Sequence, residues 1–106
     1  MSDRPKEGSL FTGKIVTKGR STGQPRTVEL RLVYLDERFY ASTTSLDRKH
    51  WCKNMLKEPS MEVLYRGVRI SCSARIISDE PQRARVLQIR GAAPGDDRTI
   101  FEMAPT

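Results

Sequence analysis

Strict alternation between apolar and polar residues is the feature that most constrains the fold of this chain. In the segment Val68–Ser78, apolar residues alternate with arginines and serines. The apolar face is formed by Val68, Ile70, Cys72, Ala74 and Ile76, and the polar face by Arg69, Ser71, Ser73 and Arg75. A period of two predicts a β-strand with one buried face. The segment Thr27–Leu35 repeats the pattern, with Val28, Leu30, Leu32 and Tyr34 on its apolar face.

Four shorter segments predict the remaining strands. They are Leu10–Val16, Phe39–Thr44, Met61–Tyr65 and Thr99–Met103. The pair Asp36-Glu37 connects two strands as a tight hairpin turn, although it lacks the favoured Asn-Gly or Asp-Gly and leaves the turn type open. Arg66-Gly67 is the turn of a hairpin between the strand Met61–Tyr65 and the strand that begins at Val68.

Two short helices are expected between the strands. The segment Asp47–Lys57 places Trp51 and Met55 on one face, with Ser45 or Asp47 as the N-cap and a stop before Pro59. The segment Glu80–Ile89 is a second helix. Its signals are Asp79 as N-cap, Pro81 in the first turn and Gly91 after the end.

About six strands exceed what one flat sheet would protect in a chain of 106 residues. Closing the sheet buries one face and removes exposed edges. We therefore predict a mainly β fold with two short helices, closed into a small barrel. Residues 1–8 are expected to be a flexible N-terminal arm, and residues 9–106 a single domain.

Composition indicates which classes of partner and which cellular compartment to expect. The formal net charge is +6, which favours an anionic partner such as a phosphorylated small molecule, a nucleic acid or an acidic membrane. The start of the chain has no apolar signal-peptide core, and no apolar stretch is long enough for a membrane span. Cys52 and Cys72 form neither a disulfide framework nor a metal-ligand cluster. We expect a cytoplasmic protein without a metal site.

The turn Lys18–Arg26 is the most informative stretch for function. Gly19 and Gly23 let the backbone approach a ligand closely, and successive amides of such a turn can bind an anion. Arg20 and Arg26 add planar donors that match phosphate oxygens, and Ser21 and Thr22 add hydroxyl groups. The pattern is neither a Walker loop nor a Rossmann glycine motif. On composition alone, a solvated cationic hairpin loop is the favoured interpretation, because charged turns are common.

The order of residues from Thr17 to Leu30, Thr-Lys-Gly-Arg-Ser-Thr-Gly-Gln-Pro-Arg-Thr-Val-Glu-Leu, resembles a family signature. It is similar to that of the deazaflavin-dependent nitroreductase family, within the pyridoxamine phosphate oxidase-like split-barrel superfamily. Asp47-Arg-Lys-His-Trp51 with Asn54 and Pro59 resembles the helix of that family, and Asp97-Arg98-Thr-Ile100 with Pro105 resembles its terminal strand.

This resemblance implies a split β-barrel that binds a deazaflavin coenzyme of the F420 type, with FMN as the alternative cofactor. Hydride transfer to a small organic acceptor is the implied activity, and a homodimer is the implied assembly. Arg20 and Arg26 would meet the phosphate, within a turn that also offers Lys18, Ser21, Thr22 and Gly23. Further cofactor contacts are implied for Thr27, Val28, Ser42, Thr43, Thr44, Arg48, Lys49, Trp51 and Asn54.

Other interpretations stay open at this point. A barrel of this family that binds a cofactor without catalysis would have the same sequence signals. A nucleic-acid-binding barrel would also be small and basic, and Arg69 and Arg75 could follow a phosphate backbone. That strand face has no aromatic residue on which a base could stack, which argues against this interpretation. No catalytic residue is assigned, and His50, the only histidine, is expected to be a surface side chain.

Overall fold

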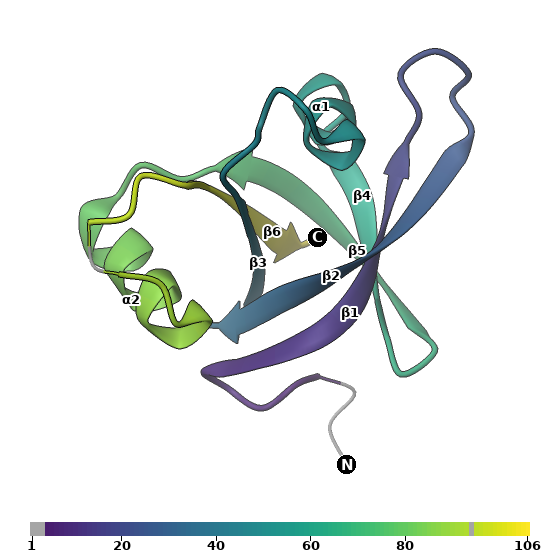
Figure 1. Ribbon diagram of the computed structural model, residues 1–106. Coiled ribbons are helices and arrows are strands. Elements are labelled where there is room, and N and C mark those ends of the chain that lie inside the picture. Colours follow the sequence, from purple (N-terminus) through teal and green to yellow (C-terminus); the bar gives the residue numbers. More distant parts are fainter. Residues whose placement is uncertain (1–3, 94) are drawn as a thin grey trace.

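The computed structural model describes residues 4–93 and 95–106, and within them six antiparallel strands close into a barrel (Figure 1). Around the barrel the strands follow the order β1-β2-β3-β6-β5-β4. The elements are β1 (Ser9–Lys18), β2 (Pro25–Leu35), β3 (Arg38–Thr43), α1 (His50–Lys57), β4 (Ser60–Tyr65), β5 (Val68–Ile76), α2 (Glu80–Arg90) and β6 (Thr99–Pro105). The predicted mainly β barrel with two helices is confirmed. The division into an arm and one domain stays a prediction.

Strands β1 and β2 form a ribbon that extends beyond the barrel wall. Their pairing runs from Ser9 opposite Tyr34 to Lys18 opposite Pro25, whereas β1 pairs with β4 only over Lys14–Val16. The connection between β1 and β2 therefore projects past the barrel, on the side where α1 lies (Figure 1). This geometry places the predicted functional turn beside α1, which begins only at His50, after β2 and β3.

One hydrophobic core fills the barrel. It contains Ile15, Leu32, Phe39, Val63, Ile70, Phe101 and Met103 from the strands, all nearly inaccessible to solvent. The helix α1 adds Trp51, Cys52 and Met55 to the same core, so its apolar face packs onto the barrel as the sequence predicted. The Trp51 ring lies 5.9 Å from that of Phe101, edge to face.

A second core lies under α2, on the outside of the barrel. It is formed by Val33, Leu35, Tyr40, Ile77, Val86, Leu87 and Ile100. The prediction of one buried face along Thr27–Leu35 is therefore wrong at its end, since β2 is buried on both faces there. The prediction that Ile76 lies on the buried face of its strand is also wrong, because Ile76 is 42% exposed while Ile77 is buried beneath α2. Both differences arise because α2 covers an outer surface that alternation alone assigns to solvent.

The predicted turn and cap signals are confirmed in part. Asp36 and Glu37 have φ of 54° and 63°, which is the left-handed geometry of a type I′ hairpin turn. The Asp79 carboxylate accepts from the Gln82 amide at the start of α2, and Gly91 ends the helix at φ 83°. The cap predicted for the first helix is wrong. Its N-cap is Lys49, with no side-chain hydrogen bond, so α1 begins later than Asp47.

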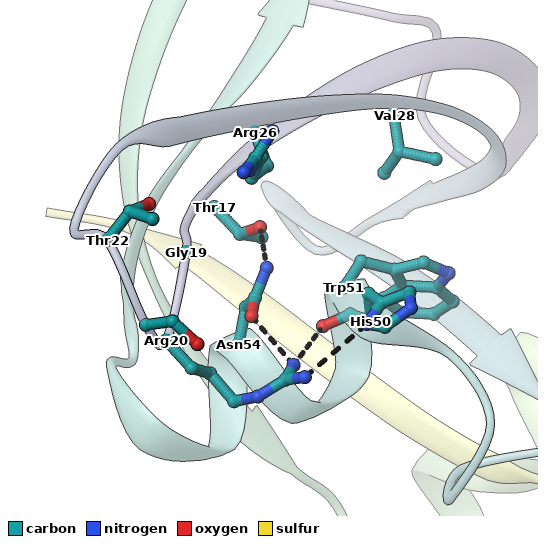
Figure 2. Close-up of a pocket in the computed structure, with 10 residues that line it drawn as sticks. Thr17, Gly19, Arg20, Thr22, Arg26, Val28, His50, Trp51 and Asn54 are labelled. Carbon is teal, nitrogen blue, oxygen red and sulfur yellow. Dashed lines mark hydrogen bonds between the residues drawn. The ribbon is translucent and has the colours of Figure 1, made fainter.

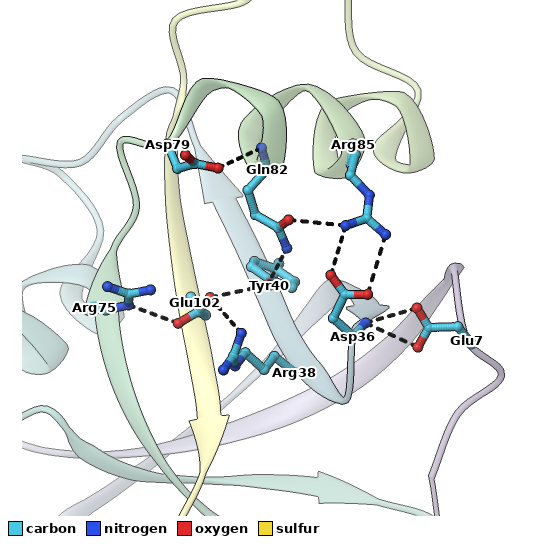
Figure 3. Close-up of polar contacts among 9 residues, drawn as sticks. All are labelled: Glu7, Asp36, Arg38, Tyr40, Arg75, Asp79, Gln82, Arg85 and Glu102. Atoms are coloured by element: carbon cyan, nitrogen blue, oxygen red, sulfur yellow. Dashed lines mark hydrogen bonds and ion pairs between the residues drawn. The ribbon is translucent and has the colours of Figure 1, made fainter.

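A buried carboxylate holds α2 against the barrel (Figure 3). Glu102, 4% exposed, accepts from Arg75 Nε at 2.8 Å and from the Tyr40 hydroxyl at 3.1 Å. The Tyr40 oxygen in turn accepts from Gln82 Nε2 of α2 at 2.7 Å. Each buried polar atom in this chain of contacts has a partner, as a low-dielectric environment requires.

The other end of the same network reaches the N-terminal segment (Figure 3). Arg85 of α2 donates to both carboxylate oxygens of Asp36, at 2.8 and 3.3 Å. The Asp36 amide donates to both oxygens of Glu7, at 2.8 and 3.1 Å. Residues 1–3 of the predicted arm lie outside the described residues. Glu7 is exposed but contacts the hairpin turn between β2 and β3.

Candidate functional site

A pocket of about 410 Å³ lies between the β1–β2 turn and α1 (Figure 2). It is lined by Thr17, Gly19, Arg20, Ser21, Thr22, Arg26, Val28, His50, Trp51 and Asn54. The turn and the ends of β1 and β2 supply one side, and the first turns of α1 supply the other. The pocket thus joins two of the three segments that carry the family resemblance, namely the β1–β2 turn and α1.

Arg20 connects the turn to the helix across this pocket (Figure 2). Its Nη1 donates to Asn54 Oδ1 at 2.8 Å and to the main-chain oxygen of His50 at 3.2 Å. Its Nη2 lies 3.4 Å from His50 Nδ1. In the other direction, Lys57 Nζ donates to the main-chain oxygen of Arg20 at 3.2 Å. Within the described residues, the contacts of the Arg20 guanidinium therefore all go to residues of α1.

Asn54 is the buried centre of this connection. It is 4% exposed, and its Nδ2 donates to Thr17 Oγ1 at 3.0 Å. Thr17 is itself buried at the end of β1. The side chains of Thr17, Asn54 and Arg20 thus form a chain of hydrogen bonds from the barrel wall through α1 to the turn, which fixes the width of the pocket.

A few internal hydrogen bonds determine the shape of the turn itself. The Gly19 amide donates to Gln24 O at 2.8 Å, the Gly23 amide to Gly19 O at 2.9 Å, and the Gln24 amide to Thr22 Oγ1 at 3.1 Å. A Cβ on Gly19 would lie 3.2 Å from both Gln24 O and Thr22 Oγ1, so a larger residue would require these neighbours to shift slightly. Within the described part of the chain, the amides of residues 20–22 make no hydrogen bond. These amides are the ones available to an anion.

Cationic and apolar groups line the rest of the pocket. The Arg26 side chain is exposed and makes no hydrogen bond or ion pair among residues 4–93 and 95–106. Its guanidinium donors are therefore available to a ligand. Val28 and the largely buried Trp51 provide apolar surface further along the same pocket (Figure 2). A ligand with an anionic end and a flat apolar end matches this arrangement.

The structure brings together about half of the residues that the sequence suggested for cofactor contact. Arg20, Ser21, Thr22, Arg26, Val28, Trp51 and Asn54 line the pocket. Lys18 and Gly23 face a neighbouring cavity, and Thr27 faces a third one. Ser42, Thr43, Thr44, Arg48 and Lys49 do not line the pocket. Thr43 instead accepts a hydrogen bond from the Ser45 amide, which shapes the loop before α1.

Two of the residues that line the pocket, Thr17 and His50, were not assigned to the site from the sequence, whereas Gly19 was expected in the anion-binding turn. His50 is exposed, as expected for a surface side chain, but it also lines the pocket. A signal was available, because His50 and Asn54 are four residues apart and so share a helix face. Thr17 shares the inward face of β1 with the core residue Ile15, by the period of two.

Cysteine and metal chemistry find no support in the described residues. Burial raises the pKa of both Cys52 and Cys72 to about 11, so both thiols are protonated near neutral pH. Neither thiol lines the pocket. No group of His, Cys, Asp and Glu side chains that could hold a metal ion occurs within residues 4–93 and 95–106. Among the same residues, no helix is long and apolar enough to cross a membrane.

The six-stranded barrel, with a cationic, partly apolar pocket between its first hairpin and a helix, has a split-barrel fold. Residues 4–100 match the family described as F420H(2)-dependent quinone reductase. The chain belongs to this family. It is therefore an oxidoreductase that uses a reduced deazaflavin, and the predicted cofactor class and activity are confirmed.

Solved structures support the fold. A FAD-binding protein from Mesorhizobium loti is similar with a TM-score of 0.70 and 17% identity, over 90% of this chain and 80% of that one. An F420-H2 dependent reductase is similar with a TM-score of 0.68 and 19% identity, over 87% of this chain and 92% of that one. An F420 reductase is similar with a TM-score of 0.62 and 17% identity, over 97% and 96%. No curated protein matches significantly.

Proposed function

We propose that the pocket between the β1–β2 turn and α1 binds F420H2 and that the protein uses it to reduce a quinone. The observation that carries this proposal is the set of unused donors at one end of the pocket. They are the amides of residues 20–22 and the guanidinium of Arg26, which lie beside an apolar surface at Val28 and Trp51. A phosphate matches the donors, and a flat ring matches the apolar surface.

The protein groups in the pocket divide into binding and positioning roles. Arg26, Ser21 and Thr22 would bind the phosphate, since they offer charged and hydroxyl donors on the same turn. Arg20 contributes mainly by holding that turn against α1 through Asn54. Val28 and Trp51 would lie along the ring and exclude water from it.

Basic residues outside the pocket extend its positive field. Arg48 and Lys49 are exposed just before α1 and make no ion pair among the described residues. They would attract the acidic tail of the coenzyme and raise the association rate, without contacting the ring. Lys18 lies at the end of β1 in the same region and is also exposed.

The acceptor follows from the family and from the chemistry of the cofactor. When bound, a reduced deazaflavin supplies a hydride. With a hydride from the reduced cofactor and a proton from solvent, the quinone would become the quinol, and the proton left over from cofactor oxidation would return to solvent. The protein does not need a nucleophile for this reaction. Its residues bind the reactants, orient them and limit the access of water.

Assembly and compartment extend the same proposal. One structural neighbour, 19% identical over 87% of this chain, is described as a domain-swapped dimer. We propose that this chain also forms a homodimer. We place the protein in the cytoplasm, where two unpaired cysteines such as Cys52 and Cys72 remain reduced.

Titration of the purified protein with F420 and with FMN, side by side, tests the cofactor. We expect F420 to bind about tenfold tighter than FMN or better, because the site is built for a phosphate followed by an acidic tail. Oxidation of F420H2 with menadione, a soluble naphthoquinone, then tests the reaction. Preference for FMN, or no binding of F420, would contradict the proposal.

A further inference from the structure

His50 is the residue of the pocket whose chemistry the cofactor-binding roles leave unused. It is the first residue of α1 and the only histidine in the sequence. Its side chain is exposed and lines the pocket next to Trp51 (Figure 2). An exposed side chain at the rim can reach a second reactant that enters beside a bound cofactor.

Arg20 fixes both the position and the tautomer of this histidine. One guanidinium group contacts the main-chain oxygen of His50 at 3.2 Å and its ring Nδ1 at 3.4 Å. A guanidinium has donors and no acceptor, so Nδ1 can only be the acceptor in this contact. The ring proton of the neutral imidazole therefore resides on Nε2.

The support for this arrangement is buried at Asn54 and Thr17, whereas Arg20 itself is partly exposed. Arg20 is held by its shortest contact, 2.8 Å to Oδ1 of the buried Asn54, which is anchored in turn on Thr17. The imidazole is thus positioned from the barrel wall through three side chains, although it is itself exposed. A donor that is held before the ligand arrives loses little entropy on binding.

The direction of electron flow shows which reactant benefits from such a donor. During hydride transfer, negative charge develops on the quinone oxygen while the deazaflavin loses electron density. A hydrogen bond to the quinone oxygen therefore becomes stronger in the transition state and accelerates the reaction. A hydrogen bond to the cofactor would bring no such gain.

We propose that His50, held by Arg20 as the Nε2–H tautomer, donates a hydrogen bond to the quinone oxygen that gains negative charge during hydride transfer. This inference rests on the proposed function, since it requires a quinone as the acceptor. It assigns Arg20 and Asn54 as positioning residues for an acceptor contact as well as for the cofactor-binding turn.

The test compares His50→Phe, which removes the donor and keeps a ring, with His50→Gln, which restores an N–H group at similar reach. We expect His50→Phe to lower kcat/KM for menadione by about tenfold or more, with the loss mainly in kcat. The Kd for F420 should change by less than about twofold. His50→Gln should recover most of the activity, and Leu56→Ala, an exposed change elsewhere on α1, should have wild-type kinetics.

Each contrary outcome has a distinct meaning. Wild-type turnover in His50→Phe would overturn the inference, and so would failure of His50→Gln to recover activity. A Kd for F420 weakened in His50→Phe by the same factor as kcat/KM would assign the histidine to the cofactor and also overturn it. An absence of menadione reduction by the wild-type protein would instead overturn the proposed function on which the inference rests.

Discussion

The two helices of this protein are attached to the barrel by polar networks of opposite character. At α2, the network around Glu102 and Asp36 is self-contained, because each carboxylate is matched by an arginine and by further donors (Figure 3). At α1, the network around Arg20 lies beside amides and a guanidinium group without partners among the described residues (Figure 2). Hydrogen-bond donors without partners beside a pocket indicate ligand binding, whereas carboxylates paired with arginines indicate structural support.

The largest expected effect is on cofactor affinity at the α1 side. Arg26→Ala should weaken F420 binding more than tenfold, because a charged hydrogen bond to phosphate contributes about 1.5–3 kcal/mol. Arg31→Ala is the matched control, since it removes the same charge from the same strand on the other face of β2. Equal losses of affinity in both variants, measured by titration with F420, would show that only net charge matters and would remove the contrast between the two regions.

A somewhat smaller effect is expected on stability at the α2 side. Glu102→Ala should destabilise the protein by about 2 kcal/mol, because it leaves the buried Tyr40 hydroxyl without its acceptor. For a domain of this size, this lowers Tm by roughly 8 °C. F420 affinity should stay at the wild-type value, because Glu102 does not line the pocket.

The control for this second prediction is Glu62→Ala. Glu62 pairs with Arg69 at 3.0 Å, a distance similar to the 2.8 Å of the Arg75–Glu102 pair, but the Glu62 side chain is 33% exposed, against 5% for Glu102. Its removal should cost less than about 1 kcal/mol. A cost equal to that of Glu102→Ala in thermal denaturation would mean that burial does not distinguish these carboxylates.

The smallest expected effect is on how much stability the fold loses at low pH. The hydrogen bond from Arg85 lowers the pKa of Asp36 from its ordinary value. A carboxyl group whose pKa is lower in the folded state contributes stability above its unfolded pKa of about 3.9, and this contribution is lost as the pH falls through the folded pKa. Asp36→Asn should therefore reduce the difference in Tm between pH 6 and roughly pH 3. An unchanged difference would show that this exposed pair does not stabilise the fold.

Local signals predicted most of the fold. Alternation located the strands, and Asp79 with Gly91 marked both ends of α2, because a period of two and a helix cap depend only on neighbouring residues. The burial of Val33 and Leu35 on the outer face of β2 was not predictable in this way. It depends on where α2 packs, some fifty residues later in the chain, and alternation contains no such information.

The candidate site was predictable to a similar extent. The turn from Lys18 to Arg26 was found from its glycines and arginines, whose roles are local. The place of His50 in the pocket was not predicted, because its contact with Arg20 joins residues 30 positions apart. In the same way, sequence order presented Arg20 and Arg26 as equivalent, whereas the packing of α1 engages Arg20 and leaves Arg26 facing the pocket.

The amide NMR spectrum of the labelled protein, recorded as F420 is added, tests the central claim most directly. We predict that the largest shifts occur at residues 20–22 and at His50 and Trp51, because these groups line the pocket or offer the unused amides. The amides of α2 should keep their positions. Shifts that centre on α2, or that spread evenly over the basic surface, would contradict the assignment of the β1–β2 turn and α1 as the cofactor site.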